Sequence, residues 1–190
     1  PGKVWSDGTP ITAVDLLLSH VICSSSYSLG AGLGDPEDTE VKPAFDALCY
    51  GGSYDTHHVS LPQLSADKMS LTIEYDAKIP DWQIYGPGPS PVHALVHMAE
   101  GKKSLQNAAA NLAAKAKFEK AFYDYNTKLM KAAGEVWSKS YNINKVDSST
   151  NPLLLVGNGA YILKTAVPGQ AVTLGLNPKH VTNPSGPKTN

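Results

Sequence analysis

The sequence contains no arginine, since all 16 of its basic residues are lysines. Arginine supplies the planar fork of donors that proteins use to hold carboxylates and phosphates through paired hydrogen bonds. The chain therefore offers no arginine clamp of its own to an acidic ligand. The formal net charge is −1, and such a balance favours neither nucleic acid nor an anionic membrane surface as a partner.

Long apolar runs are lacking too, because no stretch approaches the roughly 20 apolar residues that cross a bilayer as a helix. Hydrophobic residues make up 42% and charged residues 17% of the 190 positions, which is typical of one folded globular domain with a sizeable core. Residues 177–190 carry three prolines and no periodic pattern, so we expect this tail to fray. The sequence reads as a piece excised from a longer chain.

Cysteine is scarce, with only Cys23 and Cys49 present. In a secreted protein the two could close a disulfide that stabilises the fold by roughly 3 kcal/mol. They could equally be unlinked thiols that pack as small hydrophobic side chains. Spacing alone does not choose between the two arrangements.

Helical patterns occupy three regions. Thr12 can cap a helix that runs to about Ser24, where three serines and then a glycine-rich loop follow. A short helix is expected near residues 44–48 and another over residues 92–100. Residues 104–141 form a long, alanine-rich helical region with an apolar stripe at helical spacing, and a break would make it two helices.

Strand patterns lie between and after these helices. Residues 57–61 and 69–75 are expected to pair antiparallel. Residues 80–91 are rich in proline and glycine, which predicts a loop with at most one helical turn. Residues 160–166 and 171–176 flank Pro168-Gly169, which suits the central positions of a type II turn. This order of strands and helices predicts an α+β fold with a small mixed or antiparallel sheet.

Signals for catalysis are weak. The sequence has no nucleophile elbow of the G-x-S-x-G kind and no phosphate-binding loop. His93 and His97 lie four residues apart on a predicted helix, with Glu100 three residues further on, so one helix face could offer three metal ligands. Ala94 stands where a zinc protease would carry its glutamate. Packed or solvated histidines are the simpler interpretation, so we expect no metal, no cofactor and no enzymatic activity.

Two segments carry a resemblance to a known family. Residues 5–15 read Trp-Ser-Asp-Gly-Thr-Pro-Ile-Thr-Ala-Val-Asp, and residues 157–164 read Gly-Asn-Gly-Ala-Tyr-Ile-Leu-Lys. The first is similar to the W-S-D-G-x-P-L/V-T-A-x-D signature of the family 5 extracellular solute-binding proteins. The second, continued by Pro-Gly-Gln-Ala-Val-Thr-Leu at residues 168–174, is similar to the G-T/N-G-P/A-Y-x-L-K and P-G-x-x-V-x-L stretch of the same family. The sequence departs from the family after Asn177, where the usual aromatic pair is missing.

The resemblance implies a function. Members of this family bind oligopeptides, dipeptides or nickel for ABC importers and fold as two lobes of the type II periplasmic-binding-protein kind. Residues 1–176 then correspond to the extra subdomain of the first lobe. The parent protein would be a monomer, periplasmic or held to the outer face of the membrane as a lipoprotein, that captures short peptides and delivers them to a permease.

The resemblance also suggests where a ligand could touch this piece. An aromatic residue just past the first helix can reach the peptide in this family, which here indicates Tyr27 together with the hydroxyls of Ser25 and Ser26. Local packing of Tyr27 is the alternative. A nickel complex or an oligosaccharide is the alternative cargo, and a zinc-dependent enzyme that uses His93 and His97 is the alternative from another class.

Overall fold

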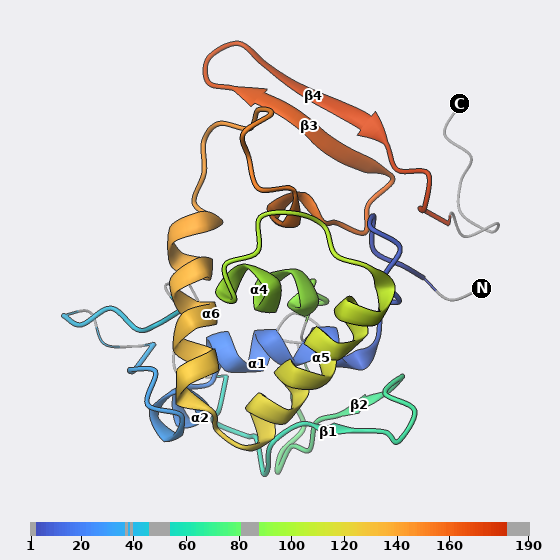
Figure 1. Cartoon of the computed structure of the whole chain (residues 1–190). Helices are drawn as coiled ribbons and strands as arrows, with labels where there is room; N and C mark the ends of the chain where they lie inside the picture. The colour runs from blue at the N-terminus through green and yellow to red at the C-terminus, as the bar shows by residue number, and fades with distance from the viewer. Residues whose placement is uncertain (1–2, 37, 39, 46–53, 81–87, 182–190) are drawn as a thin grey trace.

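The computed structural model of the chain describes residues 3–36, 38, 40–45, 54–80 and 88–181. Within these residues, the chain is a mixed α+β protein, as the sequence predicts. Helices form a central body, and one small antiparallel sheet lies at each end of it (Figure 1). No helix of the described residues is both long and apolar enough to cross a membrane.

The first helical segment begins at Thr12, as predicted. A 3-10 turn, η1 (Ala13–Leu16), runs directly into α1 (Leu17–Cys23). The carboxylate of Asp15 accepts a hydrogen bond from the Thr12 amide at 3.0 Å, which is one half of a capping box. The apolar face of α1 is buried in the main core. The capping pattern in the sequence therefore located this helix start correctly.

The serines that follow do more than end the helix. Ser24 terminates α1, as expected, but its hydroxyl also accepts a hydrogen bond from the Tyr27 amide at 3.0 Å. A second helix, α2 (Ser25–Gly30), therefore begins where the sequence predicts only a break and a loop. The loop comes after it, where Gly32 and Gly34 have positive φ angles. The serine hydroxyl can hydrogen-bond nearby backbone amides. Serine is therefore unfavourable inside a helix but favourable at its N-cap, where the amides lack partners.

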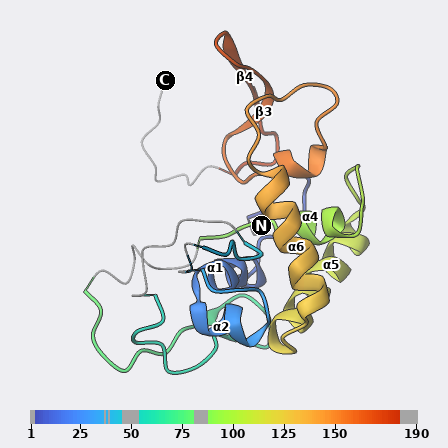
Figure 2. The same ribbon diagram turned by 90° about the vertical axis from the view of Figure 1, so that its left-hand side faces the viewer.

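The long alanine-rich region is two helices. α5 (Ala108–Tyr123) is followed by Tyr125, whose φ of 51° interrupts the helical backbone. Asn126 is then the N-cap of α6 (Thr127–Ser140), and its side chain accepts a hydrogen bond from the Leu129 amide. Both pack against α4 (Val92–Ala99), the central helix, which agrees with the predicted helix over residues 92–100. Figure 2 shows α6 beside α4 and α5, with the β3–β4 hairpin above them.

The core has two parts. The larger part joins α1, α2, α4, α5 and α6 around fully buried side chains that include Phe118, Phe122 and Met130. The smaller part surrounds Trp5 and is completed by a 3-10 turn, η3 (Pro152–Leu155). A residue near the N-terminus and residues of the segment before the hairpin therefore share one apolar cluster.

The first sheet is smaller than the sequence predicts. β1 (Gln63–Leu64) pairs antiparallel with β2 (Leu71–Thr72). The predicted pairing of residues 57–61 with 69–75 survives only as an isolated bridge between His58 and Tyr75. The orientation is therefore confirmed, whereas the extents were wrong, because both strands lie on the surface and little burial holds them.

The second sheet agrees with the prediction. β3 (Tyr161–Val167) pairs antiparallel with β4 (Ala171–Leu176). The Gln170 amide donates to the Val167 carbonyl at 3.1 Å and Gly169 has a φ of 69°, which is the geometry expected of a type II turn.

Some predictions fall partly outside the described residues. The short helix near 44–48 lies mostly there, as do most of the loop 80–91 and the tail from residue 182. Cys23 is disulfide-bonded, while Cys49 lies outside the described residues. The first residue of the tail, Asn177, is buried and its side chain donates to the Gly159 carbonyl at 2.8 Å.

Gly134 offers a test of how closely α6 approaches its neighbour. A Cβ atom placed there would lie 2.6 Å from the carbonyl oxygen of Ala44. We expect Gly134→Ala to lower the free energy of unfolding by roughly 1–3 kcal/mol, measured by urea denaturation, although alanine is the better helix former. Gly157→Ala is the control, because a Cβ there meets no atom within 4 Å. Equal stability of the two variants would contradict the close approach.

Candidate functional site

The first motif folds around a buried ion pair. The Asp15 carboxylate is fully buried and accepts hydrogen bonds from the Trp5 indole at 3.2 Å and from the Lys115 ammonium of α5 at 2.5 Å. Lys115 also donates to the Pro10 carbonyl at 2.5 Å and to the Thr12 hydroxyl at 3.2 Å. One lysine of α5 thus holds three residues of the motif.

A second polar cluster joins the motif to α4. His93 Nε2 lies 2.9 Å from Asp7 Oδ2, and the Asn111 amide donates to Asp7 at 3.2 Å and to the Thr9 hydroxyl at 2.7 Å. His97 Nε2 lies 3.0 Å from Asn111 Oδ1. Because a carboxylate and an amide oxygen only accept, the Nε2 atoms of both histidines donate in these contacts.

These contacts occupy the Nε2 atoms of the two histidines that could offer a metal ion ligands from one face of α4. His93 and His97 do lie on one face of α4, but each directs Nε2 at a hydrogen-bond acceptor from elsewhere in the fold. Glu100 approaches His97 only at Nδ1, at 3.9 Å. The described residues contain no group of three or more His, Cys, Asp or Glu side chains placed to hold a metal ion. The two histidines serve as structural hydrogen-bond donors here.

Burial and charge set the protonation of this network. Burial by itself raises the pKa of Asp7, but the hydrogen bonds from His93 and from the Thr9 amide outweigh it, so the pKa lies below its usual value. Burial lowers the pKa of Lys115, and the adjoining Asp15 carboxylate offsets this only in part. The motif therefore depends on a paired charge and would be destabilised by an unpaired one.

The two motifs meet in space. The Ser6 amide donates to the Gly157 carbonyl at 2.8 Å, and the Gly157 amide donates to the Ser6 hydroxyl at 3.2 Å. Trp5 of the first motif packs against Leu153 and Val156, which directly precede the second. Segments about 150 residues apart thus form one joint.

The predicted ligand residues lie at the start of α2. Tyr27 is only 1% exposed, its hydroxyl donates to the Phe122 carbonyl at 3.0 Å, and its ring stacks between those of Phe122 and Tyr125. Burial raises the pKa of the Tyr27 hydroxyl. The structure thus agrees with local packing of Tyr27, because the ring completes the core between α2 and α5.

The two serines differ from Tyr27. Ser26 is exposed and Ser25 is half-buried. The Ser26 amide donates to the Asp55 carboxylate at 2.8 Å, and its hydroxyl lies 3.2 Å from the Ser24 hydroxyl. A ligand contact by Ser25 and Ser26 stays a prediction.

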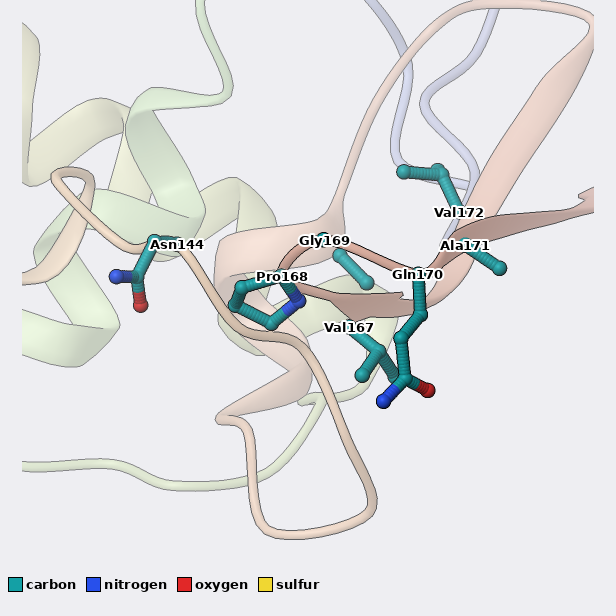
Figure 3. A pocket seen from close by; sticks show the side chains of 8 residues that line it. Asn144, Val167, Pro168, Gly169, Gln170, Ala171 and Val172 are labelled. Atoms are coloured by element: carbon teal, nitrogen blue, oxygen red, sulfur yellow. The ribbon is translucent and has the colours of Figure 1, made fainter.

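The hollow shown in Figure 3 does not have the features of a binding site. It measures about 400 Å³ and lies beside the tip of the β3–β4 hairpin, lined by Asn144 and residues 166–172. Its lining has no charged side chain, and Figure 3 shows the labelled side chains splaying apart. Ligand sites instead bring a few polar groups together within an apolar cleft.

Sequence reasoning missed Asn111 and Lys115, which anchor the first motif. A signal for them exists: positions 111, 115, 118 and 122 follow one helix face, and the last two are fully buried phenylalanines. Polar residues that continue an apolar stripe at helical spacing indicate buried polar contacts.

Replacement of Lys115 by methionine would leave the Asp15 carboxylate buried without its cation. Loss of one partner from a buried ion pair costs about 3–5 kcal/mol, so we expect the free energy of unfolding at pH 7 to fall by that amount. Lys117→Met is the matched control, since Lys117 pairs with Glu100 at the surface and such pairs contribute about 0–1 kcal/mol. If both variants unfold at the same urea concentration, the buried pair does not have the role described.

A scan against protein-family models finds no match for this chain, and searches of curated proteins and of solved structures find none either. The likeness to family 5 solute-binding proteins therefore rests on the two motifs alone.

Proposed function

We propose that this chain is part of an extracytoplasmic solute-binding protein that captures short peptides for an ABC importer. In this proposal, it is the extra subdomain of the first lobe of a type II periplasmic-binding-protein fold, has no catalytic activity and needs no cofactor. The two motifs support the proposal, because both occur in the family's order at the borders of one folded unit.

The joint between the two motifs is the observation that carries the proposal. A subdomain inserted in a lobe is connected to it by two chain crossings, and these must lie close together. Here the segments around Ser6 and Gly157, one from each of the two border motifs, exchange two hydrogen bonds. A segment with distant borders would not suit such an insertion.

The exposed face of the hairpin supports the same proposal. Large apolar side chains project from it into solvent, with Leu176 as much as 76% exposed; the others are Tyr161, Val172 and Leu174. β4 carries no charged residue that would protect its edge. Soluble proteins rarely leave such a surface bare, and the remainder of a lobe would cover it.

Binding would occur between lobes. A peptide held in an extended conformation gains backbone hydrogen bonds along its length, while loose pockets accept varied side chains. This chain has no arginine, so the carboxylate terminus of a peptide would be held by the other lobe. Ser25 and Ser26 are the candidates for contact from this side.

The wider setting follows from the family. The parent protein would work as a monomer on the outer side of the cytoplasmic membrane, periplasmic or anchored as a lipoprotein, with the ABC permease as its partner. A nickel complex or an oligosaccharide is the alternative cargo, and residues of the other lobe would decide among the three.

Cargo can be identified directly. We expect native mass spectrometry of the parent protein to reveal retained peptides, and calorimetry with a peptide panel to give saturable binding. Retention of nickel or a sugar, with no peptide binding, would overturn the cargo. Absence of any retained solute, together with no binding across all three classes, would overturn the function.

The isolated 190 residues should bind the same peptides weakly or not at all, because one wall of the cleft is missing.

In the parent protein, the double variant Ser25→Ala/Ser26→Ala should weaken peptide binding about tenfold if the hydroxyls hydrogen-bond the ligand, which corresponds to ~1.4 kcal/mol. Ser70→Ala, at another exposed serine, is the control and should bind as the unaltered protein does. An unchanged affinity in the double variant would remove both serines from the site.

A further inference from the structure

A cluster of ionisable rings holds residues 54–58 against α1. His20 of α1 is only 3% exposed, and its Nδ1 lies 3.2 Å from the Tyr54 hydroxyl. The His20 and His58 rings are stacked with centroids 5.7 Å apart, and the Tyr54 ring meets His58 edge-on at 4.6 Å. We call His20, Tyr54, Asp55 and His58 the histidine cluster.

Asp55 extends this attachment to α2. One of its carboxylate oxygens accepts a hydrogen bond from the Ser26 amide in the first turn of α2, at 2.8 Å. The other lies 4.0 Å from His58 Nδ1. A carboxylate at this end of a helix satisfies an amide that has no partner within the helix. Residues 54–58 thus touch both α1 and α2 through groups that can gain or lose a proton.

The surroundings of the two histidines are largely apolar. His20 also packs edge-on against Tyr27 of α2 and Phe122 of α5, at 5.8 and 5.7 Å. The Tyr75 ring meets the His58 ring edge-on, with centroids 4.9 Å apart. Asp55 is the charged side chain that acts on both histidines in the described part of the chain.

This environment disfavours the protonated form of each ring. Burial, and next the neighbouring His58, lower the pKa of His20 to about 4, although Asp55 opposes the shift. Burial lowers the pKa of His58 as well, again against Asp55. An exposed histidine takes up its proton near pH 6.5, so the undocked state binds protons first as the pH falls. The docked state therefore keeps its full stability above about pH 6.5 and loses it progressively toward pH 4.

We propose that the histidine cluster is an acid-released latch, which holds residues 54–58 on α1 and α2 at neutral pH and frees them when its imidazoles are protonated. Release would withdraw the Asp55 carboxylate from the Ser26 amide and so loosen the first turn of α2. The latch stands on these contacts alone and does not depend on the proposed function.

Hydrogen exchange read by mass spectrometry tests the latch. Amides to follow are Ser26, His58 and Val59, which are bonded to Asp55 Oδ2, the Asp55 carbonyl and the Glu74 carbonyl. Between pH 7.5 and pH 4.5, after scaling for the intrinsic pH dependence of exchange, we expect the protection of these amides to fall at least tenfold. Protection in α5 should stay constant, since release is local.

Variants separate histidine protonation from other effects of acid. His20→Phe keeps a ring in the core but cannot take up a proton, so the loss of protection should shrink to less than threefold. His180→Asn is the control, because His180 is exposed and its Nδ1 lies 3.2 Å from the Asn158 carbonyl at the opposite end of the fold. This variant should behave as the unaltered chain does. In the double variant His20→Phe/His58→Phe no imidazole of the cluster remains, so an unchanged loss of protection there would assign the effect to Asp55 and overturn the latch.

A second measurement needs no variant. The imidazole C–H resonances of the unaltered chain, followed by NMR from pH 7.5 down to about pH 3, should show His20 titrating near pH 4. Titration of His20 near pH 6.5, pH-independent protection at residues 54–59, or an equal loss of protection throughout α5 would each overturn the proposal.

Discussion

The buried pair of Asp15 and Lys115 is the interaction on which the arrangement of this chain depends. Asp15 receives the Trp5 indole and the Thr12 amide as well as the Lys115 ammonium. The same carboxylate therefore places the indole in the core and starts the first helix. It also fastens the N-terminal segment to α5, which lies about 100 residues further along the chain. A buried charge tolerates such a position only when its partners are fixed, so this pair restricts how α5 can lie.

The Asp7 cluster and the motif joint extend this constraint to the rest of the molecule. Asp7 is bonded to His93 of α4 and Asn111 of α5, and the adjacent Ser6 is bonded to Gly157. One turn of chain thus meets two helices and the segment that leads to the hairpin. Most residues of the first motif are used in building the fold. The motif consequently leaves few of its side chains available to a ligand.

Opposite the hairpin, α2 connects a structural role with a candidate functional one. Tyr27 belongs to the core, whereas Ser26 is exposed and its amide is held by Asp55. The histidine cluster behind Asp55 makes this contact sensitive to protonation. If the proposed peptide contact lies at Ser25 and Ser26, protonation of the histidine cluster would alter peptide binding through the first turn of α2.

Local patterns in the sequence determined the elements that depend on neighbouring residues. The sequence predicted the Thr12 cap, the Pro168-Gly169 turn, the helix over residues 92–100 and the α+β class, because capping, turn chemistry and periodicity act over a few positions. Tertiary structure alone decided the rest. The burial of Tyr27, the roles of Asn111 and Lys115, the structural use of His93 and the meeting of Ser6 with Gly157 all depend on partners far away in the chain. No local pattern specifies which distant group will satisfy a buried charge or hydroxyl, because that choice is made only when the helices pack.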